Sequence, residues 1–246
     1  MLPGSRFAAY CMMALAILIG GGSLLLYGVF LIIGPITIVR LYASERRMLL
    51  WDGLLSLVFF IQHSVMVRTS FRARLAPIIP RHYHPSIYAI TSGIALTAVV
   101  LLWQPSQTVF LQVEGLLRLL ARAILVVAIV GFSWAVQALG NFDTFGLAPI
   151  RAHLRGKQLR APNFVLRGPY LRVRHPLYLF MLVLIWSGPD VSSDRLLFNV
   201  LWTLWVVLGS HLEEKDLVAE FGDKYRHYQK TVPMLLPWRF LRGPKL

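Results

Sequence analysis

The residues best suited to chemistry lie in a short basic and aromatic segment, residues 167–178, which separates two apolar regions. Gly168-Pro169 predicts a turn, and His175-Pro176 predicts a helix start because proline is tolerated in the first turn of a helix. Arg174 and His175 are therefore expected at the N-terminal end of an apolar helix. The free N–H groups and the dipole of such an end attract anions, so we expect a carboxylate or a phosphate to bind there.

A second group of polar residues follows the last long apolar run. The pair Glu213-Glu214 is expected to close that run, and on a helix only one of two neighbouring side chains faces a site squarely. Phe221, Tyr225 and Tyr228 come next at i, i+4 and i+7, the spacing of a single helical face. Each group alone is more typical of an interfacial aromatic belt or a solvated helix end than of a site.

The elements that must position these residues are membrane helices. Of the 246 residues, 57% are hydrophobic and 15% are charged, which is too apolar for a soluble domain. Several apolar runs reach the roughly 18–20 residues needed to cross a bilayer. We predict an all-α integral membrane protein with about six transmembrane helices, the last two forming a hairpin, followed by an amphipathic cytosolic C-terminal helix. The expected spans are 7–39, which we take as a retained helix, 49–67, 87–103, 116–139, 178–187 and 196–212.

The net charge of +14 is concentrated between the apolar runs. The regions rich in Arg and Lys are 68–85, 140–177 and the C-terminal tail, whereas 104–115 and 188–194 have none. The positive-inside rule then places both termini and the active site on the cytosolic side of a bacterial inner membrane or an endomembrane, although Arg40, Arg46 and Arg47 fall on the opposite side. No nucleic-acid-binding pattern accompanies the charge, so we expect the lipid bilayer as partner, with neither nucleic acid nor an obligate protein partner.

Polar residues inside the second apolar run are further candidates. Gln62 and His63 lie near its end, and polar groups at membrane depth usually face a protein interior or a water-filled cavity. A metal site built from His63, His82 and His84 is an alternative, but no Cys or further His completes a usual ligand spacing, so we predict no metal. The single cysteine, Cys11, excludes an intrachain disulfide.

Taken in order, the two chemical groups resemble the membrane methyltransferases typified by isoprenylcysteine carboxyl methyltransferase and phospholipid N-methyltransferase. The resemblance rests on Gly168-x-Tyr170-x-x-x-Arg174-His175-Pro176-x-Tyr178, followed by Glu213-Glu214-x-x-Leu217 and Phe221-Gly222-x-x-Tyr225-x-x-Tyr228. Three upstream segments look more like the bacterial methanethiol S-methyltransferases: Gln62-His63-Ser64, Trp103-Gln104-Pro105 and Asn141-Phe142-Asp143. Nurim, a nuclear-envelope protein of the same superfamily, is also similar.

The resemblance implies a methyltransferase that uses S-adenosylmethionine. It implies that Arg174 and the helix start at His175-Pro176 bind the methionine carboxylate, and that Glu213 or Glu214 binds the ammonium or the ribose hydroxyls. The adenine and the sulfonium would be covered by Tyr170, Tyr178, Tyr225 and Tyr228. The implied acceptor-side residues are Gln62, His63, Asn141 and Asp143. If the acceptor is a thiol, it must lose its proton, and the candidates for promoting this step are His63, His175 and Arg174.

The acceptor is therefore expected to be small or lipophilic, with a thiol favoured. Two alternatives stay open: methylation of a prenylcysteine carboxylate or a phospholipid amine, and a nurim-like membrane protein without catalysis. Phe180 occupies a position where the family usually has glycine, which would crowd the cofactor, and Asn141 replaces the histidine usual in the methanethiol group. We divide the chain by function into 1–139, a transmembrane scaffold with the acceptor side, and 140–246, the cofactor-binding region, within one structural domain.

Overall fold

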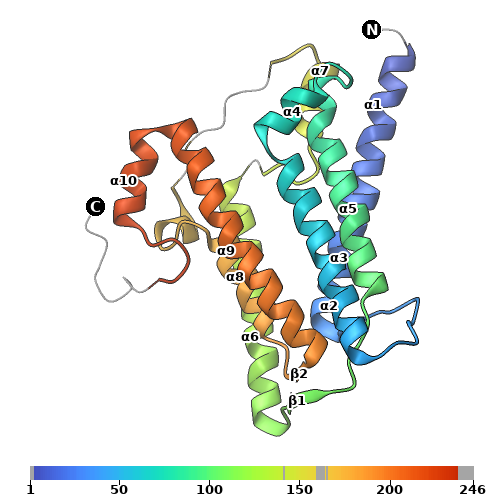
Figure 1. Ribbon diagram of the computed structural model, residues 1–246. Helices are drawn as coiled ribbons and strands as arrows, with labels where there is room; N and C mark the ends of the chain where they lie inside the picture. The colour runs from blue at the N-terminus through green and yellow to red at the C-terminus, as the bar shows by residue number, and fades with distance from the viewer. Residues whose placement is uncertain (1–2, 141, 159–163, 165, 238–246) are drawn as a thin grey trace. The chain divides into compact units, whose positions relative to one another are not determined.

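The computed structural model describes residues 3–140, 142–158, 164 and 166–237, and it is almost entirely helical (Figure 1). Its elements in the first half are α1 (Pro3–Leu15), the π-helical turn η1 (Ala16–Gly21), α2 (Gly22–Ile33), α3 (Glu45–Met66), α4 (Thr69–Leu75), the 3₁₀ turn η2 (Arg81–Tyr83), α5 (His84–Leu102) and β1 (Val109–Gln112). Those in the second half are α6 (Gly115–Leu139), α7 (Leu147–Leu154), the 3₁₀ turn η3 (Gly168–Leu171), α8 (Pro176–Trp186), β2 (Asp190–Ser192), α9 (Ser193–Phe221) and α10 (Asp223–Thr231).

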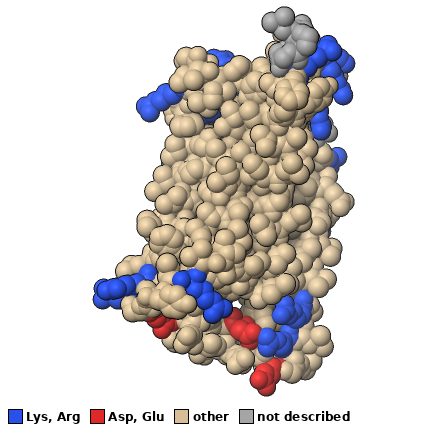
Figure 2. All heavy atoms as spheres, turned by 90° about the vertical axis from the view of Figure 1, so that its right-hand side faces the viewer, with Lys and Arg blue, Asp and Glu red and all other residues tan. Residues whose placement is uncertain are grey.

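The long helices are those of a membrane protein. Five described segments are long and apolar enough to cross a bilayer: Arg6–Ile33, Glu45–Met66, Arg81–Leu102, Gly115–Leu139 and Ser193–Phe221. α8 is also apolar but has only 11 residues. On the face drawn in Figure 2, charged side chains gather at the two ends and are nearly absent across the middle. The prediction of an all-α, multi-pass membrane protein is confirmed.

The chain divides into two compact units, of which the first comprises 1–107 and 143–161. Its central helix is α5, which packs against α3, α2 and η1. Glycines make this close packing possible, since a Cβ on Gly93 would lie 2.9 Å from the carbonyl oxygen of Ile19. The first span ends at Ile33, earlier than predicted, because Gly34 adopts a φ of +103° that a helix cannot continue.

The second unit comprises 108–142 and 162–246 and contains both predicted chemical segments, 167–178 and 213–228. α6 packs along α8, and α8 and α9 form the predicted hairpin. β2 lies in the connection of this hairpin and pairs with β1 in antiparallel fashion, with Gln112 opposite Asp190. An ion pair of 2.6 Å between Arg118 of α6 and Asp190 of β2 also joins these two elements. The predicted division of function between 1–139 and 140–246 stays a prediction.

The last apolar helix is longer than predicted. We expected it to end at Leu212, but α9 continues to Phe221, so that Glu213 and Glu214 lie inside the helix. Gly222 then ends it with a φ of +59°, and α10 begins at the next residue. Glu213 and Glu214 therefore lie within a continuous helix, which fixes the directions of both side chains.

The break at Gly222 also corrects the predicted aromatic face. Phe221 belongs to α9, whereas Tyr225 and Tyr228 belong to α10, so the three rings do not share one helical face. They meet instead around the ring of Phe164, at centroid distances of 5.3, 6.0 and 5.5 Å. The three aromatic residues therefore do form a cluster, as their spacing suggested. They are joined through Phe164, which lies far from them in the sequence, and not along one helical face.

Phe180, the departure from the family pattern, points its ring at α6. A Cβ built on Gly131 of α6 would overlap this ring, so Gly131 supplies the space that Phe180 fills. The pair shows that a large residue on α8 is accommodated by a missing side chain on α6. The concern that the Phe180 ring crowds a cofactor at the start of α8 is thereby reduced, because the ring packs between two helices.

We predict that Gly131→Ala destabilises the protein by about 1–3 kcal/mol, because the added methyl group forces the Phe180 ring out of a filled interface. Gly209→Ala on α9 is the matched control, since a Cβ there meets no atom within 4 Å. That control should be neutral or slightly stabilising, because alanine has the higher helix propensity. The free energy of unfolding of both variants can be measured by denaturation in detergent. Equal values for the two variants would contradict the packing assigned to Phe180.

Candidate active site

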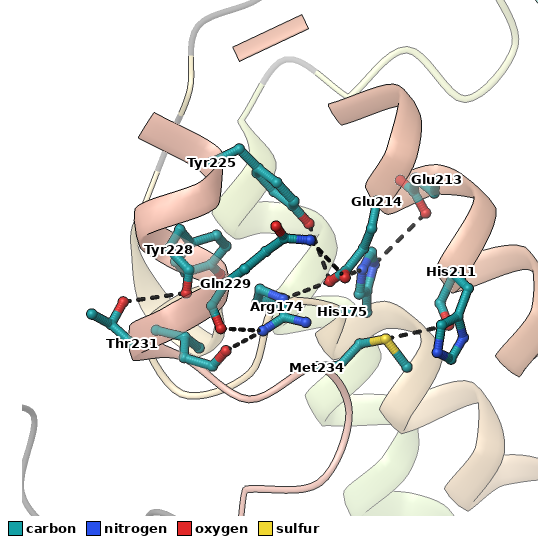
Figure 3. Close-up of polar contacts among 12 residues, drawn as sticks. Arg174, His175, His211, Glu213, Glu214, Tyr225, Tyr228, Gln229, Thr231 and Met234 are labelled. Atoms are coloured by element: carbon teal, nitrogen blue, oxygen red, sulfur yellow. Dashed lines mark hydrogen bonds and ion pairs between the residues drawn. The ribbon is translucent and has the colours of Figure 1, made fainter. Parts of the chain in front are cut away.

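Four of the predicted residues, Arg174, His175, Glu213 and Glu214, come together in the second unit (Figure 3). His175 immediately precedes α8, whose proline at the first position starts the helix as predicted. Glu213 and Glu214 extend from α9. α10 completes the group with Gln229, which the sequence reasoning did not single out. Segments some forty positions apart in the sequence thus supply one polar cluster.

Arg174 forms the ion pair at the centre of this cluster. Its Nε donates to Oε1 of Glu214 at 2.5 Å, and both side chains are about nine-tenths buried. Its Nη1 donates to the backbone carbonyls of Gln229, at 2.9 Å, and of Val232. These carbonyls lie at the C-terminal end of α10, where the helix dipole favours a cation. Arg174 is therefore neutralised within the protein, and its predicted contact with a cofactor carboxylate stays a prediction.

The backbone at the start of α8 is held by the segment that follows α10. The N–H of Arg174 donates to the carbonyl of Pro233 at 2.9 Å, and the N–H of His175 donates to the carbonyl of Met234 at 3.0 Å. Two neighbouring N–H groups are thus bonded to the tail of the chain. This pairing brings α10 against the start of α8 and gives the cluster a rigid frame.

His175 is buried between the two glutamates, with only 6% of its side chain exposed. Its Nε2 lies 3.3 Å from Oε1 of Glu214, and its Nδ1 lies 3.7 Å from Oε2 of Glu213. Burial lowers the pKa of His175 below its usual value, and the attraction of the two glutamates only partly opposes this. The ring is therefore neutral at pH 7. The hydrogen-bond pattern assigns its proton to Nε2, facing Glu214, and leaves Nδ1 as an acceptor.

The two glutamates have different environments. Glu214 is the residue on which the cluster converges, and its carboxylate accepts hydrogen bonds from Arg174, His175, Tyr225 at 3.4 Å and Gln229 at 2.9 Å. Oε2 of Glu213 is a buried atom that accepts no hydrogen bond from any residue the structure describes. The sequence left open which glutamate faces the site. The structure commits Glu214 to the ion pair and leaves Glu213 with a buried, unsatisfied acceptor.

The predicted tyrosines surround this cluster in different ways. The ring of Tyr178 stacks on His175 at a centroid distance of 5.4 Å. The hydroxyl of Tyr228 donates to the backbone carbonyl of Tyr170, which joins α10 to η3. Burial raises the pKa values of Tyr170, Tyr225 and Tyr228, so all three hydroxyls stay protonated. Those of Tyr225 and Tyr228 act as donors.

A cavity of about 310 Å³ opens beside Glu214. Its lining consists of His211, Glu214, Lys215 and Val218 from α9 and Gln229 from α10. The four α9 residues are spaced i, i+3, i+4 and i+7, so they form one helical face. Counting helical turns from Glu214 would have identified His211, whereas Gln229 could have been found at i+4 from Tyr225. Neither was predicted.

Comparison with curated proteins decides the family. The chain is 33% identical over 199 residues to methanethiol S-methyltransferase 1 of Bradyrhizobium diazoefficiens, which covers 80% of this chain and 69% of that protein. It is 36% identical over 198 residues to the methanethiol S-methyltransferase of Pseudomonas deceptionensis, covering 79% and 75%. The chain belongs to the methanethiol S-methyltransferase family. Nurim of Rattus norvegicus is 28% identical over 183 residues, covering 69% and 68%. No family model and no solved structure matches the chain.

Membership of the methanethiol S-methyltransferase family confirms the resemblance drawn from the motifs. It also confirms the predicted class of enzyme, a membrane methyltransferase, because the relatives are named methyltransferases and the helices are long and apolar enough to span a bilayer. An enzyme of this class requires a methyl donor. The polar cluster around Glu214 lies in the segments that carried the motif, so it is the candidate site for this family's chemistry in the present chain.

Two predicted acceptor-side residues lie in the first unit, in a polar cluster between α3 and α5. Gln62 donates to the hydroxyls of Thr91, at 3.1 Å, and Ser92, at 3.3 Å. The hydroxyl of Tyr88 is bonded to Nε2 of His63 at 2.6 Å. Oε1 of Gln62 is buried and accepts no hydrogen bond within the described residues. The sequence reasoning missed Tyr88, Thr91 and Ser92, although polar residues in an apolar run were the available signal.

The other two predicted acceptor-side residues have different outcomes. Asp143 accepts hydrogen bonds from the backbone N–H groups of Leu147, at 2.9 Å, and Ala148, at 2.7 Å, and so caps the start of α7. Its capping role explains an aspartate at this position without a substrate. Asn141 lies outside the described residues. The acceptor roles of both stay predictions.

The three histidines weighed as metal ligands bond to different partners. His63 pairs with Tyr88, Nε2 of His84 is bonded to the carbonyl of Ile79 at 2.9 Å, and His82 stacks on His153 at 3.8 Å. In the described part of the chain, no group of three or more His, Cys, Asp or Glu side chains is arranged to hold a metal ion.

Proposed function

We propose that this chain transfers a methyl group from S-adenosylmethionine to a small thiol of the methanethiol class. Curated relatives at 32–36% identity are named methanethiol S-methyltransferase, which supports the thiol as acceptor. The observation that carries the proposal is the pair of buried acceptors, Nδ1 of His175 and Oε2 of Glu213, beside the Arg174–Glu214 ion pair. The concentration of Arg and Lys in the same connections supports a site on the cytosolic side.

The residues of the cluster fit this cofactor. Nδ1 of His175 and Oε2 of Glu213 face each other, and both are hydrogen-bond acceptors, so neither donates to the other. Burying such an acceptor costs free energy unless a donor reaches it. S-adenosylmethionine carries an ammonium group and ribose hydroxyls, which are donors of the required type. Lys215 lines the cavity and offers a cation for the carboxylate of the cofactor, because Arg174 is already paired with Glu214.

The charge of the cluster favours a cationic ligand. Glu214 is balanced by Arg174 and His175 is neutral, so the carboxylate of Glu213 leaves the group with a net negative charge. When bound, S-adenosylmethionine supplies a methyl group on a positively charged sulfonium. Its demethylated product lacks that charge, so Glu213 contributes less to holding the product and favours its exchange. The rigid frame around Arg174 contributes by positioning, and burial of the cluster excludes water.

The acceptor must present a thiolate, because the thiol itself is a poor nucleophile. Arg174 is held by Glu214 and by two carbonyls as a permanent cation, so it does not accept a proton. Among the three residues predicted for this step, His63 and His175 remain. His63 is bonded to Tyr88, which would orient its ring and select its tautomer.

The test is an assay of purified protein with S-adenosylmethionine and three acceptors: methanethiol, a farnesylated cysteine and phosphatidylethanolamine. We expect dimethyl sulfide from methanethiol and no methylation of the other two, because the family relatives act on the small thiol. Methylation of the prenylated cysteine or the phospholipid alone would overturn the thiol assignment. Folded protein that does not bind S-adenosylhomocysteine would instead support a nurim-like protein without catalysis.

A further inference from the structure

A second cavity, of about 370 Å³, lies in the first unit and is lined by residues without a role in the proposed methyl transfer. Its walls are Arg6, Tyr10 and Met13 from α1, and Arg151, Leu154 and Arg155 from α7 and its C-terminal end. The α1 residues are spaced i, i+4 and i+7, and the α7 residues i, i+3 and i+4, so one face of each helix forms a wall. α7 packs against α1, and Figure 1 draws it beside the upper turns of that helix.

Within the described part of the chain, the cavity brings three positive charges together without a counter-charge. Among the residues that the structure describes, the guanidinium groups of Arg6, Arg151 and Arg155 form no ion pair. Like charges sharing a cavity repel one another, and the repulsion is relieved when an anion binds between them. Two helix faces that converge with arginine on both sides are therefore arranged for an anionic ligand.

The first unit has few carboxylates of its own, and each is bonded elsewhere. Its three acidic residues are Glu45, Asp52 and Asp143. Glu45 accepts a hydrogen bond from Ser106, Asp52 accepts one from the backbone N–H of Gln104 at 2.9 Å, and Asp143 caps α7. The same unit carries 12 of the 25 Lys and Arg residues of the chain. The anion for the cavity must therefore come from outside this unit.

The position of the cavity along the first span identifies the kind of anion. The apolar span runs from Arg6 to Ile33, so the cavity lies at the end of the span, at the depth of lipid headgroups. Tyr10 is a residue typical of the membrane interface, and Met13 and Leu154 add apolar surface to a wall that otherwise consists of arginines. A phospholipid can contact the arginines through its phosphate and the apolar side chains through its glycerol and acyl chains. A free phosphate would contact only the arginines.

We propose that this cavity binds the phosphate of an anionic phospholipid headgroup. The three guanidinium groups bind the phosphate oxygens, and Met13 and Leu154 contact the beginning of the acyl chains. Arginine suits this role because its planar fork can bond two phosphate oxygens at once. The bound lipid joins α1 to α7 and so stabilises the first unit independently of the methyl-transfer site.

The test compares the thermal unfolding midpoint of the full chain in nanodiscs of phosphatidylcholine alone and of three parts phosphatidylcholine to one part phosphatidylglycerol. We expect the midpoint of the wild type to rise with phosphatidylglycerol. Arg151→Gln/Arg155→Gln should lose most of that rise and should retain phosphatidylglycerol roughly 10-fold or more weakly by native mass spectrometry. Arg46→Gln/Arg47→Gln, which removes the same charge from exposed positions on α3, should keep the rise.

Three outcomes would overturn the proposal. The first is no rise in the wild type, and the second is an equal loss in both double variants, which would reflect surface charge only. The third is the same stabilisation by inorganic phosphate in phosphatidylcholine nanodiscs, which would make the cavity a site for soluble anions. A variant that fails to fold is recognised by its midpoint in phosphatidylcholine alone, in which case the single variant Arg155→Gln is compared instead.

Discussion

Replacing Glu213 with glutamine is expected to weaken binding of S-adenosylhomocysteine by roughly 10- to 100-fold while leaving the protein folded. Oε2 of Glu213 is a buried acceptor that receives no hydrogen bond from the described residues. A hydrogen bond from a cofactor ammonium or hydroxyl to this carboxylate would be charge-assisted, and such bonds contribute about 1.5–3 kcal/mol. The Glu213 side chain is 44% exposed, and among the described residues it makes no hydrogen bond that holds the fold. Calorimetric titration of detergent-purified protein measures the affinity.

Glu220→Gln is the matched control for this experiment. Glu220 lies on the same helix, is exposed, and is not part of the cavity lining, so the substitution removes the same charge without touching the cluster. Its affinity should equal that of the wild type. Unchanged binding in Glu213→Gln would refute the assignment of this carboxylate to the cofactor, and equal weakening in both variants would indicate a general effect of charge.

Replacing Glu214 with glutamine is expected to lower the free energy of unfolding by about 3–5 kcal/mol. The substitution leaves the guanidinium of Arg174 nine-tenths buried without its counter-charge, and breaking a buried ion pair from one side is far more costly than its net contribution suggests. It also weakens the contacts that His175 and Gln229 make with the same carboxylate. Denaturation of helical structure in detergent mixtures, followed by circular dichroism, measures the loss.

The double variant Arg174→Met/Glu214→Leu separates the cost of an unpaired charge from that of lost packing. Removing both charges should recover a large part of the stability lost in Glu214→Gln, because no uncompensated charge remains buried. Recovery will be incomplete, since Arg174 also bonds the carbonyls of Gln229 and Val232 at the end of α10. A Glu214→Gln variant as stable as Glu220→Gln would show that the ion pair does not hold the cluster together.

Much of the fold follows from local properties of the sequence. Backbone polar groups in lipid must be hydrogen-bonded within the protein, so apolar runs form helices there. Five of the six expected spans and the α8–α9 hairpin were therefore predictable from the apolar runs of the sequence. The ends of helices were less predictable. α9 continues nine residues beyond Leu212, because most of the following residues favour a helix and Gly222 is the residue that ends it.

The candidate site was predictable in its membership but not in its connections. Arg174, His175, Glu213 and Glu214 were identified from residue type, order and resemblance, and the structure brings them together. Which glutamate pairs with Arg174 depends on the rotation of α9 relative to the start of α8, which no local pattern encodes. Gln229 was missed for the same reason, since only the fold of α10 beneath Glu214 gives its amide a function.

The sequence by itself therefore determined that this chain is a helical membrane protein of a methyltransferase family, since hydropathy and motif order are properties of short segments. Tertiary structure alone decided that Glu214 neutralises Arg174 and that the Phe180 ring occupies the space left by Gly131. It also decided that, among the described residues, one oxygen of Glu213 has no donor. Each of these depends on how segments far apart in the sequence meet in the fold. Such contacts depend on how helices pack and rotate against one another, and packing is settled by the whole set of side chains at once.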